Sequence, residues 1–201
     1  MHRNSAKLLV IAVTLLVPDR LAAQSAQAVS MQISGLYNVV FGDVFRNLKN
    51  GVGGEVQLRY TPGALSVGAG FQYTTHRRPP LQLGEPGYAQ LYGGFVEPRY
   101  RIHTGSNVLA PYLSARFSLL KVDFSDEGSS LSSSFVQVNG GGGFLYRLGS
   151  RLNLDLGATF GYNRLGSGTL KIEENPNPKA VPASSGSNIM VRFGFAVGLG
   201  G

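Results

Sequence analysis

The feature that most constrains this chain is a strict alternation of apolar residues with small or polar ones. Residues 151–164 show it most cleanly, with Leu152, Leu154, Leu156, Ala158, Phe160 and Tyr162 set against Asn153, Asp155, Gly157, Thr159, Gly161 and Asn163. Successive side chains of a β-strand point to opposite faces, so a period of two predicts a strand with one apolar and one polar face. Beyond residue 30, no segment shows the 3.6-residue apolar period of an amphipathic helix.

The same alternation predicts eight strands, at residues 31–41, 52–60, 64–74, 88–102, 108–120, 136–147, 151–164 and 189–200. Within 108–120 the phase slips near Leu119 and Leu120, which we interpret as a β-bulge. Short turns at 61–63, 103–107 and 148–150 alternate with long loops near 42–50, 76–87, 121–134 and 165–187. This meander is typical of outer-membrane barrels. We therefore expect an all-β fold, an eight-stranded antiparallel up-and-down transmembrane β-barrel.

Alternation alone does not say which face points inward, because a soluble barrel would turn its apolar face to the interior. Only 14% of the residues are charged, and the polar face is built largely from Gly, Ser, Ala, Asn and Gln. Small side chains suit the narrow lumen of an eight-stranded barrel. Outside the N-terminal segment the lysines lie in or beside the long loops, where they avoid lipid: Lys49, Lys121, Lys171 and Lys179. These features favour a polar lumen and a lipid-facing apolar surface.

Tyrosines of the apolar face gather at both ends of the predicted strands. Tyr60, Tyr100 and Tyr146 precede the short turns, and Tyr73, Tyr88, Tyr92 and Tyr162 lie near the long loops. Tyrosine rings anchor at membrane–water interfaces, because one end of the side chain is apolar and the other is polar. We therefore predict two interface belts of aromatic residues.

The N-terminus has the pattern of an export signal. A basic start with Arg3 and Lys7 precedes ten apolar residues and then a run of small residues. This order predicts a signal peptide over residues 1–28, cleaved after Ala23 or Ala28, and a barrel domain over 29–201. Ten apolar residues are too few for a membrane-spanning helix, which needs about 20. The chain has no cysteine, which excludes a lipoprotein, disulfides and thiolate metal sites.

Removal of the predicted signal leaves 15 basic and 10 acidic residues, because Arg3, Lys7, Arg20 and Asp19 are lost. This excess is too small to indicate a nucleic-acid partner. The phase of the strands places nine charged side chains in the lumen: Glu55, Arg59, Glu97, Arg99, Arg101, Arg116, Arg147, Asp155 and Arg192. Buried charges must be paired, so we predict a salt-bridged network that plugs the barrel. A gated pore that favours anions is the alternative, because arginines outnumber carboxylates six to three.

Three other patterns are weaker candidates for sites. Gly140–Gly143 resembles a phosphate-binding loop, but it lies inside a predicted strand, where close packing explains it better. Arg77 and Arg78 follow His76 and are a possible lipopolysaccharide contact, with ordinary surface charge as the alternative. Loop carboxylates could share a divalent cation but have no ligand spacing, so solvated charge is the preferred interpretation: Asp123, Asp126, Glu127, Glu173 and Glu174.

Catalysis is not expected. His76 and His103 are the histidines left after cleavage, and neither has an obvious serine and carboxylate partner in the predicted strands. We expect no catalytic residue, no cofactor and no bound metal.

The pattern resembles the small bacterial outer-membrane barrels of the OmpA/OmpX type. The resemblance covers residues 30–201 and includes stretches such as Phe95-Val-Glu-Pro-Arg-Tyr-Arg-Ile102, with Phe193 and Phe195 similar to the alternating aromatics of the last strand in these proteins. It implies a non-enzymatic outer-membrane protein of a Gram-negative-type envelope, with a structural or surface-interaction role through its extracellular loops. A narrow porin-like channel for small or apolar solutes, or a lipid-modifying enzyme, are the alternatives. The expected partners are outer-membrane lipids, lipopolysaccharide and the barrel assembly machinery, and the expected state is a monomer.

Overall fold

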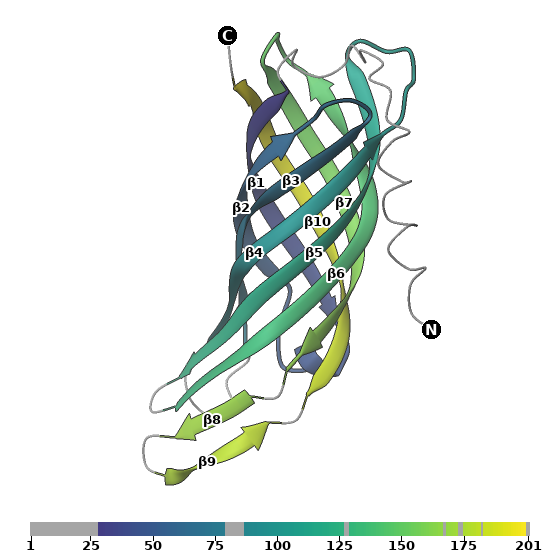
Figure 1. Ribbon diagram of the computed structural model, residues 1–201. Coiled ribbons are helices and arrows are strands. Elements are labelled where there is room, and N and C mark those ends of the chain that lie inside the picture. The colour runs from purple at the N-terminus through teal and green to yellow at the C-terminus, as the bar shows by residue number, and fades with distance from the viewer. Residues whose placement is uncertain are drawn as a thin grey trace, which may run out of the picture.

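Eight antiparallel strands close into a barrel in the computed structural model, which describes residues 28–78, 87–126, 129–166, 168–172, 175–181 and 183–199 (Figure 1). The pairing of β10 with β1 and of β5 with β6 completes the ring. The barrel strands are β1 (Val29–Phe41), β2 (Gly51–Tyr60), β3 (Leu65–Arg77), β4 (Tyr88–Arg101), β5 (Leu109–Asp126), β6 (Ser129–Arg147), β7 (Leu152–Leu165) and β10 (Ser184–Leu199). The predicted fold class is confirmed. The predicted signal segment lies outside the described residues, except for Ala28.

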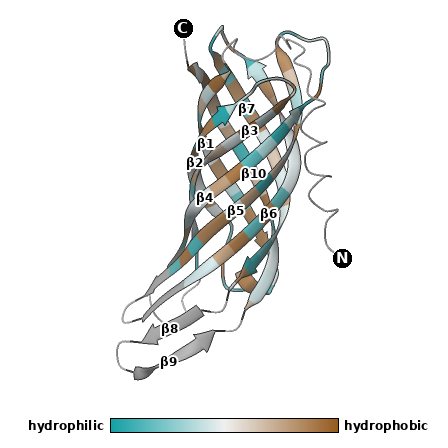
Figure 2. Cartoon of the chain, in the orientation of Figure 1, coloured by the Kyte–Doolittle hydropathy of each residue, from teal (hydrophilic) through white to brown (hydrophobic). Residues whose placement is uncertain are grey.

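The barrel is apolar outside and polar inside, the reverse of a water-soluble protein. On β1 the side chain of Ile33 points outward and is 59% exposed, whereas Gln32 points inward and is 1% exposed. Figure 2 shows the resulting alternation of hydrophobic and hydrophilic residues along the strands. Because the register is fixed by the hydrophobic pattern, a slip of one residue would turn every side chain to the wrong face.

Two of the longest strands extend beyond their predicted ends. The segment 121–134, predicted as a loop, is mostly strand, because β5 runs to Asp126 and β6 begins at Ser129. The predicted bulge is also wrong, since Leu119 is 72% exposed and Leu120 is 4% exposed, as in an unbroken alternation. The sequence suggested a slip in phase because Leu120 is an apolar residue that faces the lumen.

A further hairpin occupies part of the predicted loop 165–187. It consists of β8 (Gly168–Ile172) and β9 (Asn175–Val181), and β8 pairs with Ser129–Ser132 at the start of β6. The hairpin lies beyond the barrel at the long-loop end, the lower end in Figure 1. Pro176 and Pro178 argue against a central strand, but β9 pairs with β8 alone, and an edge strand tolerates residues that lack an N–H.

The first long loop holds a single turn of 3-10 helix, η1 (Asp43–Phe45), at the same end of the barrel. Among the described residues no helix is long and apolar enough to cross a membrane. Gly42 precedes η1 with a φ of 91°, a left-handed conformation that favours glycine. The turn directs Phe45 into the mouth of the barrel, where its side chain is 4% exposed.

Candidate functional site

Inward-facing side chains fill the lumen in four layers along the barrel. From the short-turn end, these are a small apolar cluster (Ala110, Tyr112 and Leu145), a network of charges, a layer of Asn, Gln and Thr, and an apolar cluster at the long-loop mouth. The layers follow from the alternation, since each strand contributes every second residue to the interior. The arrangement places buried polar groups opposite one another across the lumen.

Glu97 is the hub of the charge network. It lies on β4, is fully buried, and contacts the guanidinium groups of Arg59, Arg99, Arg116 and Arg192, which come from four strands. Oε2 of Glu97 accepts a hydrogen bond from Nε of Arg116 at 2.7 Å and one from Nη1 of Arg192 at 2.8 Å. Charge-assisted bonds of this kind compensate for the cost of burying the carboxylate.

Two further carboxylates complete the network. Asp155 on β7 accepts from Nη1 of Arg99 at 2.8 Å and from the hydroxyl of Tyr112 at 2.6 Å. Glu55 on β2 accepts from Nη1 of Arg116 at 2.6 Å. The network therefore ties β2, β4, β5, β7 and β10 together across the lumen.

Seven of the nine predicted lumen charges are joined directly in this network: Glu55, Arg59, Glu97, Arg99, Arg116, Asp155 and Arg192. The other two lie toward the short turns. Arg101 is 8% exposed and donates from Nη2 to the carbonyl of Gly63 at 2.9 Å, and Arg147 is half-buried at the end of β6.

The alternation did not single out Tyr112, although it participates in the network. Its hydroxyl accepts from Nη2 of Arg192 at 2.9 Å, and the guanidinium of Arg99 lies 4.4 Å from the centroid of its ring. The sequence could have indicated this role, because Tyr112 alternates in phase with Ser114 and Arg116 and so lies on the polar face of β5. An aromatic residue on the polar face of a strand is a candidate for such a network.

The amide layer lies between the charges and the mouth. Oδ1 of Asn188 accepts from the side-chain amides of Asn163 at 2.9 Å and Asn139 at 3.2 Å, and its own amide donates to Asn38 at 2.7 Å. All four residues are at most 4% exposed. This layer crosses the lumen with neutral side chains that hydrogen-bond to one another.

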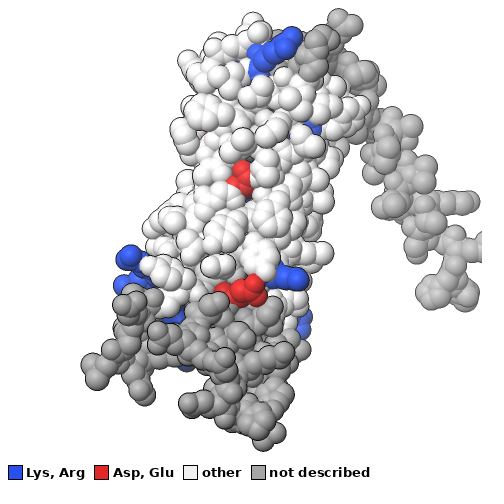
Figure 3. Space-filling view, turned by 90° about the vertical axis from the view of Figure 1, so that its left-hand side faces the viewer, with Lys and Arg blue, Asp and Glu red and all other residues white. Residues whose placement is uncertain are grey.

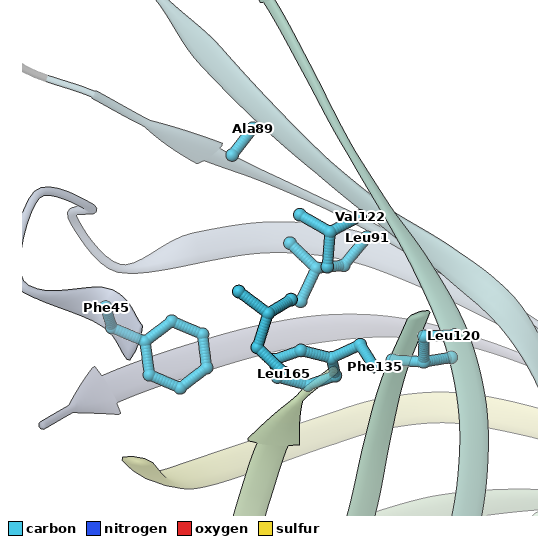
Figure 4. Close-up of a cluster of buried hydrophobic side chains, with 7 residues drawn as sticks. All are labelled: Phe45, Ala89, Leu91, Leu120, Val122, Phe135 and Leu165. Carbon is cyan, nitrogen blue, oxygen red and sulfur yellow. The ribbon is translucent and has the colours of Figure 1, made fainter. Parts of the chain in front are cut away.

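The mouth of the lumen is apolar, which the sequence did not predict. Seven buried side chains pack there, from η1 and from β4, β5, β6 and β7 (Figure 4): Phe45, Ala89, Leu91, Leu120, Val122, Phe135 and Leu165. Within the cluster the rings of Phe45 and Phe135 meet edge to face, with centroids 5.8 Å apart. The lumen is therefore closed at the long-loop end by apolar side chains and in the middle by paired charges.

The predicted tyrosine belts lie on the outer surface. Six of the seven side chains are 40–56% exposed there: Tyr60, Tyr73, Tyr88, Tyr100, Tyr146 and Tyr162. Tyr92 is half-buried and donates its hydroxyl to Oδ2 of Asp123 at 2.6 Å. Figure 3 shows lysines and arginines of one face toward the two ends of the barrel, with acidic side chains at mid-barrel and near the lower end.

The two arginines that follow His76 differ in exposure. Arg77 is exposed at the end of β3, whereas Arg78 is half-buried and donates its backbone N–H to the carbonyl of Gly87 at 2.9 Å. Two other outward-facing basic residues are exposed at the same end, Lys121 on β5 and Arg164 on β7, which the sequence analysis did not assign to a lipopolysaccharide contact. They have the same parity as Phe117 and Tyr162, which also face outward.

The structure supports no phosphate or metal site at the glycine run or at the described acidic residues. Gly140–Gly143 lies within β6, and a Cβ on Gly143 would come within 2.1 Å of the carbonyl oxygen of Leu156, so the chain needs glycine for packing there. Asp123 belongs to β5 rather than to a loop. The side chains of Asp126, Glu127, Glu173 and Glu174 lie outside the described residues. The described residues contain no group of three or more acidic or histidine side chains placed to hold a metal ion.

The two histidines lie in contrasting environments. His76 is fully buried in the lumen, with Nδ1 3.0 Å from the carbonyl oxygen of Lys49, whereas His103 is exposed in a short turn. Among the described residues neither forms a hydrogen bond with a serine or a carboxylate, so they show no arrangement for nucleophilic catalysis.

Comparison with known proteins identifies solved structures with a similar fold. No protein-family model matches the chain, and no curated protein sequence matches it. Among solved structures, Neisserial surface protein A (NspA) is 18% identical with a TM-score of 0.62, over 86% of this chain and 97% of that one. Outer membrane protein OprG of Pseudomonas aeruginosa is 12% identical with a TM-score of 0.56, over 88% and 98%. A major outer membrane protein of Thermus thermophilus is 16% identical with a TM-score of 0.55, over 85% and 99%.

These identities are low, so the comparisons show the fold alone. The chain has the fold of the small outer-membrane β-barrels, as the resemblance in the sequence implied.

Proposed function

We propose that the chain is a non-enzymatic integral protein of the bacterial outer membrane, closed to solutes, whose role is carried by its long-loop end. The observation that carries this proposal is the filled lumen, with Glu97 bound to four arginines across the barrel axis. The apolar exterior supports the membrane location, because exposed bands of large apolar residues are stable in lipid and not in water.

A conducting pore is the competing function, and the layers of the lumen argue against it. An ion path would have to separate Glu97 from its arginines, which leaves charges buried without partners. It would also have to cross the amide layer around Asn188 and the apolar mouth around Phe45. Each of these barriers is made of side chains that already pair with, hydrogen-bond to or pack against one another.

We expect purified, refolded protein to give no discrete conductance steps in a planar bilayer at either polarity. A silent bilayer is informative only if the protein has inserted, so insertion is checked in parallel by heat-dependent gel migration of protein recovered from vesicles. A general porin incorporated under the same conditions is the positive control. Reproducible unitary steps that disappear when the sample is heat-denatured would contradict the closed lumen and favour the channel.

We further propose that the long-loop end contacts phosphate groups of lipopolysaccharide. Arg77, Lys121 and Arg164 face outward there, and Arg78 adds a half-buried cation. Basic groups near an anionic lipid surface contribute roughly 1 kcal/mol each. The other expected partners are the surrounding lipids and the barrel assembly machinery, and we propose a monomer, because the apolar exterior is accounted for by lipid.

The triple replacement of Arg77, Lys121 and Arg164 by serine is expected to weaken binding of lipid A by about 100-fold in low-salt buffer without divalent cations, as three cations at roughly 1 kcal/mol each imply. The measurement is a binding titration of purified protein in detergent. Arg151→Ser, an exposed arginine at the short-turn end, is the matched control and should leave affinity unchanged. Equal losses of lipid A affinity in the triple variant and the control would show that binding depends on the net charge of the protein and not on the position of the basic residues.

A further inference from the structure

The mouth holds the larger of the two apolar clusters in this lumen. Deeper in the barrel, inward-facing charges and amides are mixed with apolar residues such as Phe95 and Met190, whereas at the mouth Leu91, Val122 and Leu165 pack together (Figure 4). A lumen that had only to be closed near water could use polar side chains here. Apolar side chains with a few placed polar groups are the usual lining of small-molecule sites.

Phe45 belongs to this cluster although it is not part of the barrel wall. It comes from η1, and its ring packs edge to face on Phe135 and stacks on His76 with centroids 6.3 Å apart and an interplanar angle of 23°. The turn that carries it begins at Gly42, and no side chain caps it. Backbone hydrogen bonds hold the turn and its exit, including Lys49 N–H to the carbonyl of Arg77 at 2.8 Å. Phe45 is thus an aromatic ring inserted into the mouth from a short connecting turn.

His76 is a buried polar side chain that packs against this cluster. The carbonyl oxygen of Lys49 only accepts hydrogen bonds, so the contact at 3.0 Å places the proton of the neutral imidazole on Nδ1. Nε2 is then an acceptor, and it is buried with no hydrogen-bond partner among the described residues. The residue as a whole is 0% exposed. A buried acceptor without a donor is unfavourable, and a bound molecule with a donor would relieve that cost.

We propose that the mouth of the barrel is a binding site for a small apolar molecule that carries one hydrogen-bond donor. The apolar part of the ligand takes the place of the Phe45 ring between Phe135 and His76, and the donor bonds to Nε2 of His76. Phe45 occupies the site when the ligand is absent. The ligand is held and not passed on, because the amide layer and the charge network lie beneath it. The site uses residues of the lumen mouth and does not depend on the outward-facing cations.

The test compares 1-naphthol, which has a hydroxyl donor, with 1-methoxynaphthalene, which has none. The chain lacks tryptophan, so naphthyl fluorescence can be followed without tryptophan emission. Wild-type protein should bind 1-naphthol saturably, and Phe45→Ala should bind it about tenfold more tightly, because the site no longer has to be vacated. Phe41→Ala is the matched control, since Phe41 lies on β1 at the same end but is 46% exposed on the outer surface. It also reports partition of the probe into detergent.

Selectivity for the donor tests the role of His76. Phe45→Ala should prefer 1-naphthol over 1-methoxynaphthalene by about tenfold, and the double variant Phe45→Ala, His76→Phe should bind both probes equally. Equal binding of the two probes by Phe45→Ala, or equal gains in Phe45→Ala and Phe41→Ala, would overturn the proposal. Heat-dependent gel migration shows whether each variant is a folded barrel, so failure of the site is distinguished from failure of the fold.

A second measurement leaves Phe45 in place. The chain has no cysteine, so Arg46→Cys carries a single nitroxide label at a position whose side chain is 77% exposed. Saturating 1-naphthol should increase the mobility of the label as η1 leaves the mouth, whereas 1-methoxynaphthalene at the same concentration should have less effect. A spectrum unchanged by 1-naphthol would overturn the exchange of Phe45 for ligand.

Discussion

Replacing Glu97 by glutamine should lower the free energy of unfolding of the barrel by about 3–5 kcal/mol, the usual cost of removing one partner from a buried ion-pair network. Glutamine has the same shape as glutamate, so the packing around it is kept and the negative charge is lost. Arg99, Arg116 and Arg192 then keep their contacts with Asp155 or Glu55, whereas Arg59 loses its ion pair with Glu97. The free energy is measured by urea titration of protein in lipid vesicles, with the folded fraction taken from heat-dependent gel migration.

Asp43→Asn is the matched control for charge removal. Asp43 also pairs with an arginine, Arg46 at 3.0 Å, but both side chains are 77% exposed. Exposed pairs contribute little, because water screens the charges, so the change expected there is below about 1 kcal/mol. A loss in Glu97→Gln no larger than in the control would show that the lumen is wet enough to screen its charges, which would also weaken the argument for a closed barrel.

Charge balance gives a further check on the same network. If the cost in Glu97→Gln arises from excess positive charge, adding Arg116→Met should recover part of the lost stability. Arg116 is fully buried and contacts both Glu97 and Glu55, so the two changes are coupled and not additive. Additive losses would instead mean that each side chain contributes mainly through packing.

The alternation predicted which side chains face the lumen, because the period of two is a local property of a strand. It placed Glu97 and Arg116 inside without any knowledge of their neighbours. It could not predict that these two meet, since contacts across the lumen depend on the stagger of strands around the barrel. The same limit applies to Asp155 and its bond with Tyr112.

The regions beyond the apolar band were predicted less well, and for identifiable reasons. Most inward residues are polar where the outside is lipid, with exceptions such as Phe95, but at the mouth Leu120 and Val122 point inward and pack in one apolar cluster with Phe45. The serines between residues 129 and 134 are typical of a loop, yet they continue β6, because a hairpin that leaves the barrel keeps its backbone hydrogen bonds. Tertiary pairing therefore overrode local propensity at the long-loop end.

Replacing Ile33 by arginine should destabilise the barrel in lipid by about 2–4 kcal/mol, the cost of a cation at the middle of the apolar band of an outer-membrane barrel. Ile33 is 59% exposed on β1, between Val29 near the short turns and Tyr37 toward the long loops. The introduced arginine cannot turn into the lumen to avoid lipid, because the lumen face of β1 is already occupied by Gln32 and Ser34. The measurement is the same urea titration in vesicles.

Leu148→Arg is the control, since Leu148 is 50% exposed but follows the last residue of β6 in a short turn. Near the interface an arginine costs about 0–1 kcal/mol, because it reaches water. The pair of variants separates a spanning barrel from a soluble one with an unusually apolar surface. On a water-exposed surface Ile33→Arg would change stability by less than about 0.5 kcal/mol, as surface substitutions do. Equal, small effects of the two substitutions would therefore contradict the membrane location, while leaving the eight-stranded fold intact.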